Sequence, residues 1–291
     1  MPLPKLIRRF KGEQPALERL PDTIKRLYGQ EMRADVDVVL EPSARKDVSA
    51  VFTHTFLGDG EEISVYGVGK DMRIQDPSFY TTLLHETAHA QDHAMVRGRF
   101  SELMDEKKAY THILSHRFKV TPSFKILIEA RAYFTEVIAR RENPPHDIGG
   151  APASIVDHFQ AKSRKEKTGG RIFAVLASVC GVASVSSAIS LFLAQPDMAF
   201  VAAAQVAVSF FGPFLAILAT MFAKIFYEDS MKASGICSQY LYMLERGRQI
   251  GEVEAFHEST SRLYKMIDRY LAMNGVKVPG SGRVDALAGA P

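Results

Sequence analysis

The sequence contains little cysteine, which limits the kinds of scaffold it can form. Only two cysteines occur among 291 residues, so the disulfide framework that holds small secreted domains together is not available. We therefore expect the chain to fold around a hydrophobic core, for which 46% hydrophobic residues are sufficient. The length is compatible with one or two domains, and the low cysteine content fits a reducing compartment.

An excess of charge of either sign is also missing. Lys and Arg number 36 against 33 Asp and Glu, and no basic cluster alternates with aromatic residues. This balance argues against nucleic acid as a partner. Residues Met1 to Phe10 lack the apolar segment and the small-residue cleavage site of a secretory signal, so we expect the N-terminal part to stay where it is synthesised.

Two long uncharged segments dominate the second half of the chain. The first runs for 23 residues from Ile172 to Ala194, and the second for 26 residues from Met198 to Ala223. Each exceeds the roughly 20 residues that a helix needs to cross a bilayer. The break between them, Gln195-Pro196-Asp197, is too short to cross back. We predict a transmembrane helical hairpin, and the alternative is a buried helical hairpin in a soluble core.

The charges that flank this hairpin indicate its orientation. Both outer ends carry basic residues, whereas the tip carries only Asp197. By the positive-inside rule, both termini and the N-terminal domain lie on the cytoplasmic side of a lipid bilayer. The basic residues are Lys162, Arg164, Lys165, Lys167 and Arg171 before the hairpin, and Lys224 and Lys232 after it.

Periodicity and turn residues predict the remaining elements. We expect helices over 15–28, 78–96, 101–118 and 122–143, and strands over 35–40, 50–57 and 61–68, the last two forming a hairpin. Apolar residues at helical spacing over 239–273 predict an amphipathic helix or helical pair. The predicted parts are therefore a domain over 1–143, a linker with a basic approach to the membrane over 144–171, the hairpin over 172–226, a C-terminal helical segment over 227–275 and a mobile tail over 276–291.

His85, Glu86 and His89 form the pattern H-E-x-x-H within the predicted helix over 78–96. Residues four apart lie on one helix face, which lets two imidazole groups bind one zinc ion. Glu86 lies beside the pair, where its carboxylate can take a proton from an attacking water instead of binding the metal. We therefore predict two zinc ligands and a catalytic base. The competing interpretation is a pair of surface histidines with an ordinary glutamate between them.

A zinc site of this kind needs a third protein ligand. The predicted helix over 122–143 offers Glu129 and Glu136, which lie on one face because seven residues make nearly two turns. Spacing alone leaves both glutamates as candidates.

The combination of H-E-x-x-H with Glu129-Ala130-Arg131-Ala132-Tyr133 on a later helix resembles the gluzincin branch of the zincin metallopeptidases. In that group the third ligand is a glutamate on a downstream helix, often in the pattern E-x-x-A. The resemblance implies an α+β zincin-like catalytic domain, with zinc bound by His85, His89 and Glu129, Glu136 as the alternate ligand, and Glu86 as the catalytic carboxylate. The metzincin branch is disfavoured, since its third ligand would fall at Met95.

Three neighbouring residues have weaker assignments. Tyr133, one turn after Glu129, is a candidate catalytic residue that would donate a hydrogen bond to the oxyanion, and the alternative is a core aromatic. Asp92 is either a carboxylate that orients a ligand histidine or a surface residue. His93 lies too far along the helix axis to share a metal with His85, so we expect it to support the site or to be exposed.

These features predict a membrane-anchored, zinc-dependent metallopeptidase acting on protein or peptide substrates near the membrane. An exposed strand over 61–68 would pair with an extended substrate. One alternative is a membrane-inserting, pore-forming or remodelling protein whose zinc-site domain is inactive or self-processing. Another is a membrane adaptor that binds zinc without catalysis.

Overall fold

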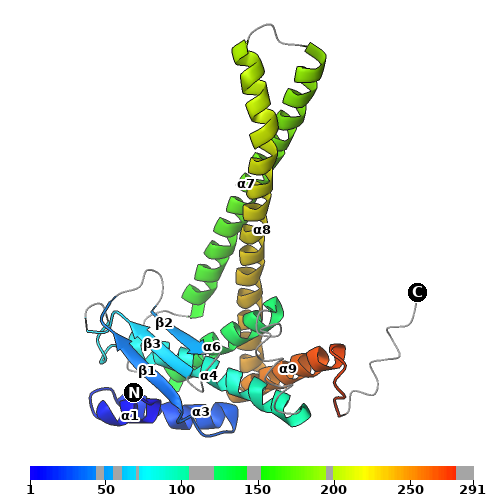
Figure 1. Ribbon diagram of the computed structural model, residues 1–291. Helices are drawn as coiled ribbons and strands as arrows, with labels where there is room; N and C mark the ends of the chain where they lie inside the picture. Colours follow the sequence, from blue (N-terminus) through cyan, green and yellow to red (C-terminus); the bar gives the residue numbers. More distant parts are fainter. Residues whose placement is uncertain are drawn as a thin grey trace. The chain divides into compact units, whose positions relative to one another are not determined.

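The computed structural model describes residues 1–43, 49–54, 61–69, 72–104, 121–142, 152–194 and 199–279. The chain divides into two compact units (Figure 1). The first comprises Met1–Pro152 together with Ser238–Pro291, and the second comprises Ala153–Cys237. The first unit is therefore built from two pieces of chain that flank the second in sequence, and it is larger than the domain predicted over 1–143.

The described chain is mostly helical and contains one small sheet. Its elements are, in chain order, α1 (Leu3–Arg9), α2 (Pro15–Glu18), α3 (Leu20–Tyr28), β1 (Val36–Glu41), β2 (Ala50–His54), β3 (Glu61–Tyr66), α4 (Pro77–Leu103), α6 (Pro122–Glu142), α7 (Pro152–Ala194), α8 (Ala199–Ile250) and α9 (Glu252–Met273).

The three predicted strands form one sheet in the order β1-β3-β2. β1 runs parallel to β3, and β2 runs antiparallel to β3 with Phe52 opposite Ile63. The predicted turn at 58–60 lies outside the described residues. The expectation that the segment 61–68 offers an exposed edge is wrong, because β3 lies between the other two strands. Alternation of apolar residues sets the buried face of a strand but not its place in the sheet, and the edge strands are β1 and β2.

α4 is longer than predicted, since it continues through Gly98 to Leu103. Its last turns pack into a hydrophobic cluster with α6 and α9, and this tertiary packing outweighs the low helix propensity of glycine. The remainder of the helix predicted over 101–118 lies outside the described residues. The buried members of the cluster are Val96, Phe100, Phe124, Leu127, Ile128, Leu263, Ile267, Leu271 and Val278.

The C-terminal segment forms the predicted helical pair. The end of α8 and the whole of α9 meet at Gly251, whose φ of 100° lies in the region that favours glycine. α9 buries Phe256, Leu263 and Ile267, and the last two belong to the hydrophobic cluster shared with α4 and α6. Helices α4, α6 and α9 therefore share one core, although residues 143–251 separate α6 from α9 in the sequence.

A fully buried ion pair lies at the centre of this helical packing. Arg131 on α6 donates from Nε and Nη2 to the Asp92 carboxylate on α4 at 2.9–3.1 Å, and neither side chain is exposed. Its Nη1 donates to the hydroxyl oxygens of Ser259 and Thr260 on α9. The guanidinium carbon also lies 4.2 Å from the ring centroid of Phe256. Arg131 therefore links three helices through charge, hydrogen bonds and a cation–π contact.

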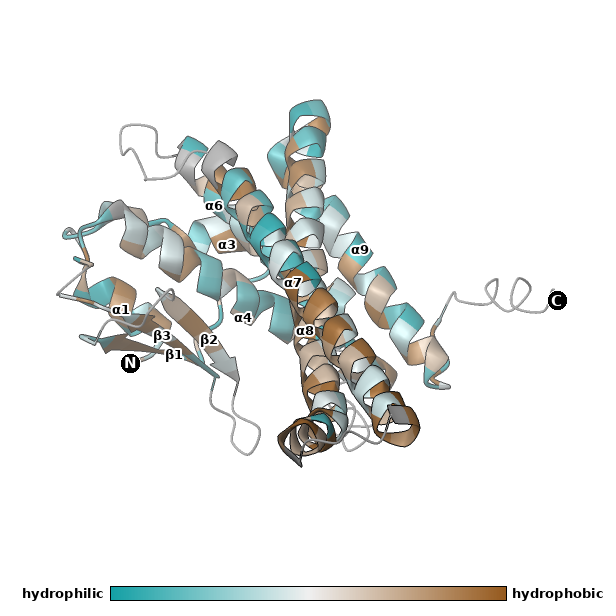
Figure 2. Cartoon of the chain, turned by 90° about the horizontal axis from the view of Figure 1, so that it is seen from above, coloured by the Kyte–Doolittle hydropathy of each residue, from teal (hydrophilic) through white to brown (hydrophobic). Residues whose placement is uncertain are grey.

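The second unit consists of two long helical segments, α7 and the first part of α8. Both helices are long and apolar enough to cross a membrane, with windows of mean hydropathy 2.1 of which only 6% and 17% is buried. Large apolar side chains are exposed along them, including Phe192 at 88% and Phe210 at 78%. Figure 2 shows hydrophobic residues concentrated along α7 and α8. Exposed apolar surface of this extent marks contact with lipid or with protein.

Contacts along both helices hold them together as an antiparallel hairpin. Phe173 stacks on Phe226 with ring centroids 5.4 Å apart, and Gln205 donates to Ser190 Oγ at 2.8 Å. Residues 152–171, predicted as part of a linker, are the helical start of α7. The tip at Asp197 and the tail from residue 280 lie outside the described residues.

We expect Arg131→Met to lower the free energy of unfolding by about 3–5 kcal/mol, because it leaves the Asp92 carboxylate buried without its cation. The double variant Arg131→Met with Asp92→Leu should recover most of that loss, since both buried charges are then removed. Urea unfolding of the detergent-solubilised protein, followed by circular dichroism, measures both effects. A double variant as unstable as the single one would show that the hydrogen bonds to α9 dominate.

Candidate metal centre

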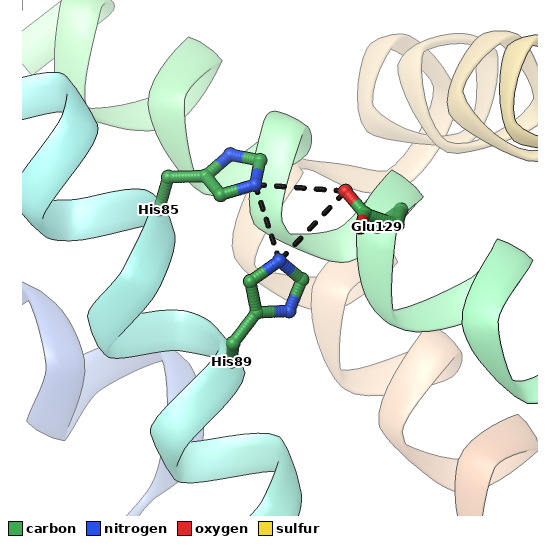
Figure 3. A group of neighbouring side chains, drawn as sticks. All are labelled: His85, His89 and Glu129. Atoms are coloured by element: carbon green, nitrogen blue, oxygen red, sulfur yellow. Dashed lines mark hydrogen bonds and ion pairs between the residues drawn. The ribbon is translucent and has the colours of Figure 1, made fainter. Parts of the chain in front are cut away.

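His85 and His89 lie one turn apart on the buried middle of α4 and face Glu129 on α6 (Figure 3). Their Nε2 atoms are 3.1 Å apart, and Glu129 Oε2 lies 3.6 Å from His85 Nε2 and 3.7 Å from His89 Nε2. The donor atoms of the three residues all lie within 4.8 Å of one another. This buried group could hold a metal ion, and it consists of the three residues that the sequence suggested as ligands.

Small buried side chains lie near the donors in the sequence. Ala88 and Ala90 on α4, and Ala130 and Ala132 on α6, are almost fully buried. Ala139, three residues after Glu136, is buried as well, so the E-x-x-A pattern does not by itself separate Glu129 from Glu136.

Glu136 lies close to the same group but contacts a different atom. Its Oε1 is 2.8 Å from His85 Nδ1, the ring nitrogen opposite the one that faces Glu129. The alternate ligand suggested by the sequence therefore contacts the outer side of the His85 ring. A carboxylate on the second ring nitrogen fixes the tautomer and orientation of a metal-binding histidine.

The electrostatic field around these histidines favours a cation. Burial disfavours a charged imidazole, but the carboxylates of Glu129 and Glu136 outweigh it and raise the pKa of His85 to about 10. Burial likewise opposes ionisation of Glu129, yet hydrogen bonds from His85 and His89 hold its pKa well below its usual range. The metal-free site therefore retains a proton between the histidines and the carboxylates, and metal binding must displace it.

Glu86 is held by an edge strand of the sheet. Its Oε2 accepts a hydrogen bond of 2.7 Å from the backbone N–H of Phe52 on β2, and its side chain is largely buried. No sequence signal pointed to this contact, because it joins a main-chain group to a residue 34 positions away.

Tyr133 lies within the site but is not among the residues that could hold the metal. Its ring centroid is 4.6 Å from that of His85, in an edge-on arrangement. Burial, followed by the charges of Glu129, Glu136 and Glu86, raises the pKa of its hydroxyl well above the usual range. The hydroxyl therefore stays protonated and can act as a hydrogen-bond donor.

The structure corrects the expectation for Asp92 and places His93 beside the site. Asp92 neither orients a ligand histidine nor lies at the surface, because it is fully buried and its carboxylate pairs with Arg131. His93 packs its ring against Phe52 and Phe124, with centroids 5.2 and 6.0 Å away. Sequence reasoning missed Arg131 as a structural residue, although a charged side chain between two alanines on a buried helix was a usable signal.

Comparison of the chain with protein-family models, with curated proteins and with solved structures finds no match. The function must therefore be argued from the site itself.

We expect Glu129→Ala and Glu136→Ala to have different effects on metal content. Loss of Glu129 removes a converging donor, so the variant should purify nearly free of metal. Loss of Glu136 removes a contact behind His85, which should weaken metal binding by about 10–100-fold while leaving detectable occupancy. Elemental analysis of both purified variants measures this difference. The reverse order would move the third ligand to Glu136, and full occupancy in both would place it elsewhere.

Proposed function

We propose that this chain is a membrane-anchored zinc metallopeptidase. The observation that supports it most strongly is the convergence of His85, His89 and Glu129 on one point, with Glu86 next to the first histidine in sequence. Two imidazole nitrogens and one carboxylate oxygen are a donor set typical of catalytic zinc, which keeps a fourth position for water or substrate. The resemblance of the motifs to the gluzincins agrees with this donor set.

The proposed reaction is hydrolysis of a peptide bond. A zinc ion held by these residues would lower the pKa of a bound water and polarise the scissile carbonyl group. Glu86 would act as the general base that removes a proton from the attacking water, and it would then return that proton to the leaving amine. Glu136 would hold His85 through Nδ1 and keep Nε2 directed towards Glu129.

Tyr133 would serve as an oxyanion donor. Its hydroxyl belongs to a ring packed beside His85, and its raised pKa keeps the proton available. A hydrogen bond from a positioned side chain to the developing oxyanion is worth a substantial part of the catalytic effect in hydrolases.

The substrate would be a protein or peptide in extended conformation. Of the two edge strands of the described sheet, β2 is the one whose backbone contacts Glu86. An extended peptide pairs with such an edge through main-chain hydrogen bonds. We therefore assign the pairing with substrate to β2 and not to the segment 61–68, which was predicted as the exposed strand.

The helices α7 and α8 would anchor the enzyme in the membrane. Their exposed apolar side chains would contact lipid, and the basic residues outside the apolar segments, with Asp197 alone at the tip, favour a cytoplasmic location for both termini. Substrates near the membrane surface would then be the ones most accessible to the site.

Glu86→Gln should abolish hydrolysis of casein while leaving about one zinc per chain, since the variant loses the base but none of the metal donors. Metal content and casein cleavage are measured on the same preparation, with the wild-type chain as reference. Zinc binding without any hydrolysis by the wild type would favour an adaptor role. Loss of zinc in the variant would give Glu86 a different role.

The orientation can be tested with single cysteines in a chain from which Cys180 and Cys237 have been replaced by alanine. We expect Lys11→Cys and Asp285→Cys to be shielded from a membrane-impermeant maleimide in sealed right-side-out vesicles, whereas Asp197→Cys should react. The expectation follows from the charge asymmetry across the hairpin. Labelling of either terminal site in intact vesicles would contradict the cytoplasmic assignment, and detergent permeabilisation controls for the reactivity of each cysteine.

A further inference from the structure

The register of β2 against β3 directs the backbone N–H of Phe52 away from the sheet. Ser49 accepts a hydrogen bond from the Tyr66 N–H, and the antiparallel pairing places Val51 opposite Ser64 and Phe52 opposite Ile63. Because hydrogen-bonded and non-hydrogen-bonded pairs alternate in an antiparallel ladder, residues 49, 51 and 53 bond to β3. The N–H groups of Ala50 and Phe52 therefore point outward at the strand edge.

The outward N–H of Phe52 has a specific acceptor. It donates to Glu86 Oε2 at 2.7 Å, a short distance typical of a charge-assisted hydrogen bond. Among the described residues, Glu86 Oε1 accepts no hydrogen bond. The carboxylate is therefore held through one oxygen, and the other remains available to accept a proton.

The donor itself is rigidly placed. β2 is bonded to β3 along its length, and the Phe52 ring packs against His93 of α4 with centroids 5.2 Å apart. The ladder thus fixes the N–H within the sheet, and the ring contact fixes it relative to the helix that holds Glu86. A donor fixed in this way orients its acceptor without the entropy cost of ordering a flexible side chain.

We propose that the backbone N–H of Phe52 is a positioning group for Glu86, holding Oε2 so that Oε1 is aimed at the attacking water. This inference rests on the proposed peptidase function. It makes the edge strand part of the catalytic apparatus, because the strand that would bind the peptide also orients the base.

The contact can be tested without any catalytic measurement, by hydrogen exchange with residue-level mass spectrometry on the metal-free chain. The Phe52 amide should exchange at least about tenfold more slowly than the Ala50 amide, which points the same way but has no carboxylate acceptor in the described part of the chain. Glu86→Ala should remove this protection at Phe52 and leave Ala50 unchanged. Equal exchange of the two amides in the wild-type chain would overturn the contact.

The positioning role requires a variant that lacks only the donor. Phe52→Pro removes the N–H, and a proline is tolerated on an edge strand where that group points away from the neighbour. Phe52→Leu is the matched control, since it removes the ring but keeps the N–H. Should the proline variant fail to fold, a backbone ester at position 52 made with 3-phenyllactate keeps the ring and replaces only the N–H by oxygen.

We would measure kcat and KM separately for each variant. The substrate is a fluorogenic peptide that spans the first casein site cleaved by the wild type. Removal of the donor should lower kcat about tenfold or more, with KM within about threefold and zinc content unchanged, and kcat should fall further than in Phe52→Leu, which loses the ring but keeps the N–H. Unchanged kcat, increased kcat or loss of zinc in the proline or ester variant would each overturn the positioning role. If the wild type cleaves neither casein nor the peptide, the proposed function fails, and the exchange result still decides the contact.

Discussion

The pair of Arg131 and Asp92 constrains how the helices of the metal centre can be arranged. Both charges are completely buried, so α4 and α6 must bring them together to avoid leaving either without a partner. Asp92 lies three residues after His89, and Arg131 lies two residues after Glu129. The ion pair and the group of His85, His89 and Glu129 are thus formed by the same two helices, and both require α4 and α6 to lie against each other. The remaining donors of Arg131 are satisfied by α9, so the C-terminal segment contributes to the same arrangement.

Local patterns in the sequence were enough to identify the histidines and the glutamate between them, because residues four apart on a helix share a face whatever the tertiary structure. Glu129 could be preferred over Glu136 only through the resemblance to gluzincins, since spacing places both on one face. The contact of Glu136 with the second nitrogen of His85 depends on the distance between two helices, and no periodicity encodes that distance. The contact of Phe52 with Glu86 depends in the same way on strand order, which alternation leaves open.

The extent of the first unit could not be predicted for a related reason. The Pro- and Gly-rich segment over 143–150 is a sound signal for a break between ordered elements, and it led to a domain boundary at residue 143. The apolar face of α9, however, has no partner that is local in sequence. Leu263, Ile267 and Leu271 pack with Val96 and Phe124 from helices that precede the hairpin. The metal centre thus depends on chain that follows the apolar helices as well as chain that precedes them.

The distribution of charge in the site gives a physical reason for a bound cation. Glu86, Glu129 and Glu136 all lie close enough to His85 to raise its pKa, against the opposing effect of burial. These carboxylates gather negative charge around one buried imidazole, and charge in a buried place is costly unless an opposite charge compensates it. A divalent cation between the two Nε2 atoms and Glu129 would compensate this charge and would leave His85 neutral, with its Nδ1 proton donated to Glu136. The pKa of about 10 and the capacity for a metal are thus two consequences of the same arrangement of carboxylates.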